Sequence, residues 1–244
     1  LRDFFAWLSF LPWLSILLSI ISITYQAYII SELSNEHRLI PFSSNFSAFF
    51  LAISYSVFAS HIWFSPVMFA NIFMVLSLKK IIGIFQQGEI KGSLYRAGIY
   101  ISIASLLYLP SIYMLFVVFY ALGIIRNFNW REYAIPLIGL LTPYLYMLIY
   151  YFVRSETDIF FNYFIEPKSF LSLLEFKWLN WIPGIMVAVL ALNSLLYLFS
   201  TGNKRTVREN NLFKIISMNF GLTLVLSFFF HKDFMSATAL IWPS

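Results

Sequence analysis

The charged residues of this chain lie in short clusters, and the long windows between the clusters contain no Asp, Glu, Lys or Arg. The six longest of these windows cover residues 4–31, 39–78, 97–125, 133–153, 178–203 and 215–231. A charge at the centre of a membrane-spanning helix costs about 2.5–3.5 kcal/mol, so charges collect at the ends of such helices. The pattern therefore predicts an all-α polytopic transmembrane bundle, with residues 1–244 forming a single integral membrane domain.

Composition supports this fold class and excludes several functions. Only 11% of the residues are charged, whereas soluble domains carry about 25%. The net charge is +5, but the basic residues flank apolar spans, so we expect contact with the lipid bilayer and no nucleic-acid partner. The chain has no cysteine, which excludes disulfides and thiolate metal sites. Because it begins with Leu1 rather than Met, we expect it to lack its native N-terminal part.

The windows predict where the individual helices lie, because a span needs about 20 apolar residues. The first window predicts a helix over residues 8–30, and the second has room for two helices separated near the proline at Pro66. Pro136 and Pro143 predict a kinked span in the window 133–153. The last two windows predict one span each.

The window 97–125 has two interpretations. A single helix would be about 43 Å long at ~1.5 Å per residue, which exceeds the ~30 Å hydrocarbon core. A hairpin broken at Tyr108–Pro110 instead places eleven of the 16 Lys and Arg residues on one side and five on the other, whereas a single crossing divides them seven to nine. Because Lys and Arg collect on the cytoplasmic side, we predict the hairpin and about eight helical segments in total.

The segment 154–177 is the only sizeable predicted loop. We expect it to lie on the surface of the membrane that faces away from the cytoplasm. Its aromatic run between charged residues is typical of a segment in the interface. The carboxylates Glu156 and Asp158, together with Asp3, are the candidate catalytic residues, because acid/base chemistry needs such groups. Nothing in their spacing selects catalysis over a solvated loop. We expect no metal site and no cofactor.

Two further groups of residues are candidate sites. Arg126 and Arg131 lie in a cytoplasmic segment and could bind a phosphate or a lipid head group, or simply anchor two spans at the surface. Gly98, Ser102 and Ser105 fall at i, i+4 and i+7 on one helix face. Small residues at this spacing allow helices to pack closely in a membrane, so we predict a packing stripe.

Two stretches between residues 60 and 150 carry distinctive motifs. The first is Trp63-Phe-Ser-Pro66 leading into Leu76-Ser-Leu-Lys-Lys80, and the second includes Ala104-Ser-Leu-Leu-Tyr-Leu-Pro110 and Arg126-Asn-Phe-Asn-Trp-Arg-Glu132. Together they resemble an uncharacterised family of polytopic inner-membrane proteins from Bacteroidetes, which implies the bacterial inner membrane and no particular activity. The order of elements is also faintly similar to the core of C-type glycosyltransferases that use polyprenyl-phosphate sugars. Those enzymes place a catalytic acid in their first outer loop, and Asp3 is nearest to that place here.

Three functions remain open from the sequence. The leading expectation is a non-catalytic integral subunit or scaffold of a bacterial envelope complex for secretion, motility or surface-glycan assembly, with other integral membrane proteins as partners. The alternative is a glycosyltransferase-like enzyme with a lipid-linked substrate. A channel or carrier is a third interpretation, but carriers usually hold ionisable residues within their spans.

Overall fold

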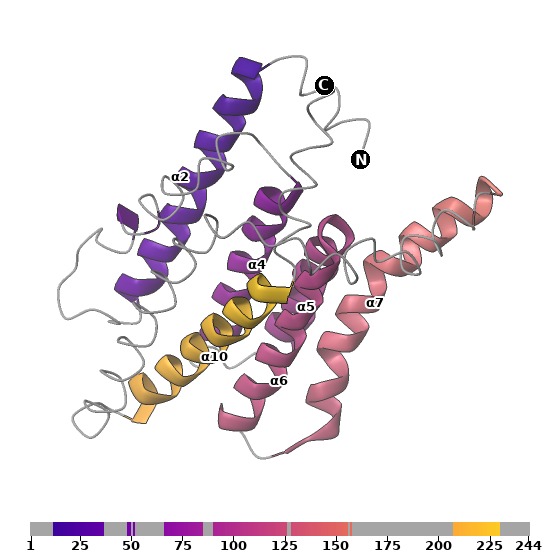
Figure 1. Cartoon of the computed structure of the whole chain (residues 1–244). Coiled ribbons are helices and arrows are strands. Elements are labelled where there is room, and N and C mark those ends of the chain that lie inside the picture. Colours follow the sequence, from indigo (N-terminus) through magenta and orange to yellow (C-terminus); the bar gives the residue numbers. More distant parts are fainter. Residues whose placement is uncertain are drawn as a thin grey trace.

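A computed structural model describes residues 12–36, 48–49, 51, 66–84, 90–125, 128–155, 157 and 207–229. The regular structure of these residues is helical, without a strand (Figure 1). The elements are α2 (Pro12–Glu36), α4 (Pro66–Gly83), α5 (Ile90–Leu107), the short 3-10 helix η2 (Leu109–Tyr113), α6 (Met114–Ile125), α7 (Trp130–Val153) and α10 (Val207–Phe229). Three of them, α2, α4 and α7, are long and apolar enough to cross a membrane.

The helix boundaries follow from local sequence. α4 begins at Pro66, where the missing N–H costs nothing. Asn129 caps α7 by accepting a hydrogen bond from the backbone N–H of Arg131, at 3.3 Å. At the other end of α7, Ser155 has a φ of 57°, the left-handed conformation that commonly follows a helix C-terminus.

The window 97–125 contains the helix break at the predicted place. Tyr108 is extended, with φ −146° and ψ 98°, and Pro110 lies in the first turn of η2. The N–H of Ser111 bonds the carbonyl of Tyr108 at 2.9 Å, which closes the turn. As a result α6 runs back beside α5, and both α5 and α7 begin at the lower end of the bundle in Figure 1.

The helices extend beyond the charge-free windows, which corrects several predicted boundaries. α2 ends at Glu36 rather than near residue 30, α5 begins at Ile90 rather than 97, and α10 begins at Val207 rather than 215. The reason is that a long charged side chain in an end turn of a helix can extend its charged group to the membrane interface. The predicted spans in 178–203 and most of 39–65 lie outside the described residues.

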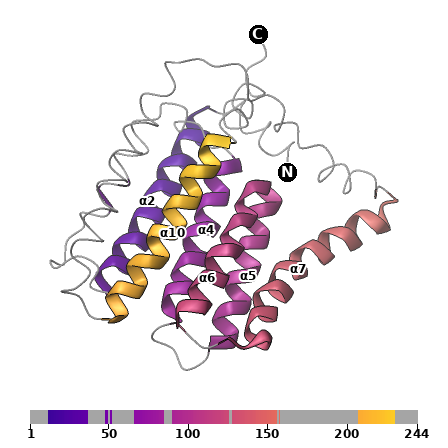
Figure 2. The same cartoon turned by 60° about the horizontal axis from the view of Figure 1, so that its bottom comes forward.

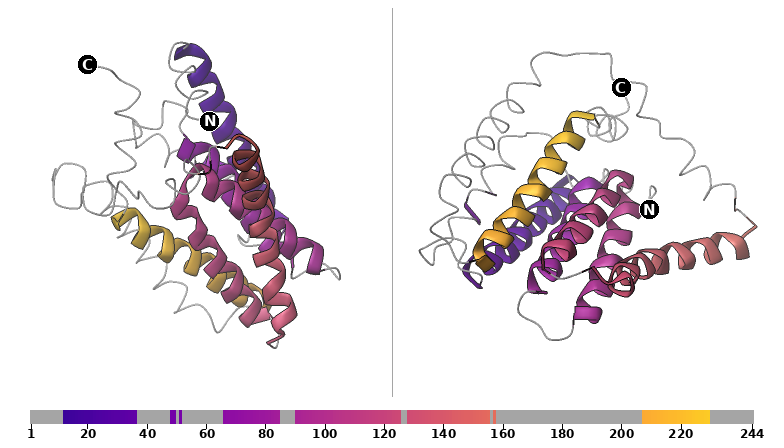
Figure 3. Two further views of the ribbon diagram at one scale, coloured as in Figure 1. Left: turned by 90° about the vertical axis from the view of Figure 1, so that its right-hand side faces the viewer. Right: turned by 90° about the horizontal axis from the view of Figure 1, so that it is seen from below.

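Contacts between helices fix their directions. α4 and α5 are antiparallel: the Ser77 hydroxyl donates to the Ala97 carbonyl at 3.4 Å, and one turn earlier in α4 the Phe73 ring contacts Tyr100, further along α5. α5 and α7 are parallel, and they cross closely at Gly98. α10 packs on α6 (Figures 2 and 3), and next to this contact the hydroxyls of Tyr113 in η2 and Thr223 in α10 are 2.8 Å apart. The main apolar core lies between these elements and includes Leu94, Met114, Val117 and Ile215.

α2 has its polarity reversed relative to a helix of a soluble protein. Its buried face carries polar residues at i, i+4, i+7 and i+11, namely Ser15, Ser19, Ser22 and Gln26. Its exposed face carries Trp13, Ile16, Leu17, Ile20 and Ile21. Soluble helices bury the apolar face, whereas membrane helices pack through small and polar residues and turn apolar side chains to lipid. The distribution in α2 is therefore that of a helix in lipid.

Charged residues of the described helices gather at one end of the bundle. The basic residues at this end are Lys79, Lys80, Lys91, Arg96, Arg131, Arg208 and Lys214. Among the Lys and Arg residues that the structure describes, only Arg154 lies at the opposite end, just after α7. We refer to these as the basic end and the Arg154 end.

Candidate functional site

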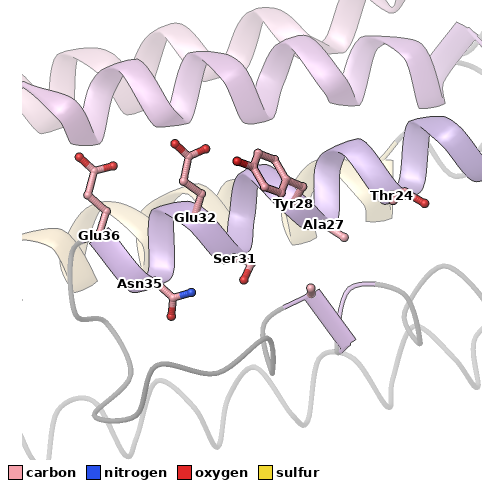
Figure 4. Close-up of a pocket in the computed structure, with 8 residues that line it drawn as sticks. Thr24, Ala27, Tyr28, Ser31, Glu32, Asn35 and Glu36 are labelled. Atoms are coloured by element: carbon pink, nitrogen blue, oxygen red, sulfur yellow. The ribbon is translucent and has the colours of Figure 1, made fainter.

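A concavity with several polar side chains lies along the second half of α2, near the basic end. It has a volume of about 710 Å³ and is lined mainly by oxygen-bearing side chains (Figure 4). The lining residues are Thr24, Ala27, Tyr28, Ser31, Glu32, Asn35, Glu36 and Ala48. Figure 4 shows Glu32 and Glu36 one turn apart and pointing the same way, with Ser31 and Asn35 on the other side of the helix. The carboxylates therefore do not converge on one point with Ser31 and Asn35.

An ion pair limits what the carboxylates of this concavity can do. The Lys79 ammonium donates to a Glu32 carboxylate oxygen at 2.6 Å, and so joins α4 to α2. Both side chains are partly exposed, and pairs of this kind contribute about 0–1 kcal/mol. Deeper in the same interface, the amide of Gln26 donates to the Met68 carbonyl at 3.4 Å. These contacts hold two helices in register and give the concavity a structural role.

Arg131 lies at the basic end, whereas Arg126, the other residue of this candidate head-group site, is outside the described residues. The side chain is exposed, and its guanidinium carbon lies 5.9 Å from the centre of the Trp130 ring. An exposed cation stacked on an interfacial tryptophan is well suited to a head group at the membrane surface. Arg126 lies outside the described residues, so its distance from Arg131 is not fixed.

The candidate catalytic carboxylates Asp3, Glu156 and Asp158 also lie outside the described residues, as does most of the predicted loop 154–177. Within the described part of the chain, no three His, Asp or Glu residues come together in a geometry that could hold a metal ion.

The stripe of Gly98, Ser102 and Ser105 lies on the buried side of α5. A Cβ added at Gly98 would collide with the Pro136 carbonyl oxygen and would lie 3.1 Å from the Cα of Gly139. One turn beyond Ser102, the Ser105 hydroxyl bonds the Ser102 carbonyl at 2.8 Å and lies 2.7 Å from the Tyr144 hydroxyl. Two glycines and a hydroxyl pair thus join α5 to α7, and the backbones approach closely where both residues lack a side chain.

Some of these contacts are indicated by a pattern in the sequence. The polar residues of α2 recur at helical spacing from Ser15 to Gln26, which indicates a buried polar face. Gly139 lies within the predicted kinked span, and a second glycine is what a close partner for Gly98 requires. The Lys79–Glu32 pair carries no such signal, because the two residues are far apart in sequence and their proximity depends on the packing of α2 on α4.

Comparison with models of known protein families, with curated proteins and with solved structures found no match. The function of the chain therefore has to be inferred from its own residues and their arrangement.

Proposed function

We propose that this chain is a non-catalytic, multi-pass subunit or scaffold that packs against other integral membrane proteins in an envelope complex of the bacterial inner membrane. About eight helical segments would cross or enter the bilayer, with the basic end in the cytoplasm. Secretion, motility and surface-glycan assembly are the kinds of complex that such a subunit would serve.

The observation that carries this proposal is the position of α7. Only Pro136, Gly139 and Leu140 are buried along its length, and all three lie in its first half. The second half of α7 turns away from the other described helices (Figures 1 and 3), and Pro143 lies within this helix. Its outer face stays apolar to the end, through Leu141, Leu145, Ile149 and Phe152. Among the described residues, α7 packs mainly on α5, and the exposed apolar face that remains is well suited to pack against a second protein.

The charge distribution favours a scaffold over an ion-coupled carrier. In the described helices, Asp, Glu, Lys and Arg lie in the part of each helix nearer the basic end, with Arg96 in α5 and Lys214 in α10 the furthest from it. Carriers that move protons or cations place ionisable side chains near the middle of their spans. Several uncharged polar groups of the described helices instead join one element to another, as in Ser105–Tyr144 and Tyr113–Thr223.

Site-specific photocrosslinking in the native membrane tests the partner. A benzophenone side chain at Leu145 or Ile149 should give one adduct of reproducible mass, containing an integral membrane protein. The matched control is Ile20 of α2, which is 59% exposed, close to the 56% of Ile149. We expect no protein adduct there. If both α7 positions react only with lipid, and the chain purifies as an active glycosyltransferase on its own, the subunit proposal is wrong.

Cysteine labelling tests the proposed topology, and the chain offers a background without native cysteine. Lys91→Cys in the first turn of α5 and Phe128→Cys just before α7 both lie at the basic end. Both should react with an impermeant maleimide only from the cytoplasmic side. Ser155→Cys lies at the Arg154 end and should react only from the outer side. Labelling of Lys91→Cys and Phe128→Cys from opposite sides would exclude the hairpin.

A further inference from the structure

A second concavity lies between α5 and α7, on the side of the bundle toward the Arg154 end. It forms because the two helices touch at Gly98 and Gly139 and then separate where α7 bends near Pro143. We call it the α5–α7 cleft. Its walls include Phe69 of α4, Ile99, Ile103 and Leu106 of α5, and Pro143 and Met147 of α7.

The walls of this cleft offer almost nothing polar. Thr142 also borders it, but the Thr142 hydroxyl donates to the Ile138 carbonyl at 2.8 Å and lies 3.2 Å from the Tyr95 hydroxyl. The polar atom is therefore satisfied within the protein. Water finds few hydrogen-bond partners in such a cleft, whereas a hydrocarbon chain needs no hydrogen bonds and is favourable there. The volume of about 460 Å³ holds roughly fifteen groups of ~30 Å³, close to a single acyl chain.

The positively charged side chain of Arg154 lies beyond the cleft, on the same face of α7. Pro143, Met147, Tyr150 and Arg154 follow each other at intervals of three or four residues, so they share one face of α7. The Arg154 guanidinium carbon lies 4.8 Å from the centre of the Tyr150 ring, which holds the charge on this face. At ~1.5 Å per residue, Arg154 lies about 10 Å beyond Met147, the distance from an acyl chain to its phosphate in order of magnitude.

We propose that the α5–α7 cleft and Arg154 form a binding site for one phospholipid, with an acyl chain in the cleft and the anionic head group on Arg154. The apolar outer face of α7 is separate from this site at Leu141 and Phe152, which lie on the side of the helix away from Pro143 and Met147. The lipid site is independent of the proposed function, and either can fail alone.

Lipid retention by the purified full chain tests the site. Delipidated protein in detergent is incubated with palmitoyl-oleoyl phosphatidylglycerol or with the diacylglycerol that has the same chains, and bound lipid is counted by native mass spectrometry. Ile103→Trp and Met147→Trp fill the cleft from its two sides and should each reduce retention of both lipids at least five-fold. Arg154→Gln should reduce retention of phosphatidylglycerol about five-fold and leave diacylglycerol unchanged.

The control is Ile138→Trp, which adds the same bulk on the outer face of α7. It should retain both lipids like the unmodified protein. Circular dichroism and gel filtration establish which variants are folded, and two cleft variants on different helices guard against the loss of either. Retention unchanged in folded cleft variants, or reduced equally by Ile138→Trp, would show only non-specific surface lipid and overturn the proposal. Phosphatidylglycerol retention unaffected by Arg154→Gln would overturn the head-group contact.

Discussion

Replacement of Gly98 by leucine should prevent α5 and α7 from packing and leave little folded protein in detergent. The first atom of the new side chain would already collide with the Pro136 carbonyl oxygen, and Gly139 Cα and Leu140 N both lie 3.1 Å from it. These neighbours are backbone atoms, which cannot rotate away as a side chain can. Overpacking costs about 1–3 kcal/mol even where side chains adjust, so we expect at least the upper end of this range. Thermal unfolding in detergent should show the midpoint lowered by ~5–10 °C or no transition at all.

Two other glycines provide matched controls for this substitution. Gly83 in α4 and Gly221 in α10 are also helical, and a Cβ added at either would have nothing within 4 Å. Gly83→Leu and Gly221→Leu should leave the midpoint unchanged or raise it slightly, since leucine favours the helix. If Gly98→Leu unfolds at the same temperature as these controls, the close crossing of α5 and α7 is not what holds the bundle together.

The sequence predicted the helical class and the main breaks because these depend on local chemistry. Pro66 starts α4, and the segment Tyr108–Pro110 interrupts the helix between α5 and α6. Proline has this effect in any context, because it lacks an N–H and has a fixed φ. Charge clusters marked the ends of spans, but the helices run further, as Glu36 at the end of α2 shows. Charged side chains whose heads reach the interface allow a helix to continue past the end of its apolar window.

Partners across helices could not be read in the same way. Gly98 carried a packing signal, but nothing local says that it meets Gly139 rather than another small residue. The same holds for the Tyr113–Thr223 hydroxyl pair, whose members are far apart in the chain. The sequence predicts Arg154 at the start of an outer loop. Its position relative to the α5–α7 cleft depends on the bend of α7. Such pairings follow from the three-dimensional arrangement of several helices.

Replacement of Leu141 by aspartate should strongly reduce insertion of α7 into the membrane. Leu141 lies at the centre of α7 and is 52% exposed, so its side chain faces whatever surrounds the protein. In lipid, an aspartate at the centre of a spanning helix costs about 2.5–3.5 kcal/mol. In water, an exposed substitution of this kind changes stability by only about ±0.5 kcal/mol. The expected loss of carbonate-resistant, membrane-inserted protein is therefore several-fold, whereas a soluble bundle would be unaffected.

The same substitution at the end of the helix separates depth from charge. Phe128 is 78% exposed and precedes α7 at the basic end, where aromatic residues of membrane proteins meet the head groups. Phe128→Asp adds the same charge to an even more exposed position, but water and head groups can solvate it there. Insertion should fall far less than in Leu141→Asp. Equal yields of both variants would mean that α7 does not cross a bilayer, because only a low-polarity surrounding makes the cost of a charge depend on its depth along the helix.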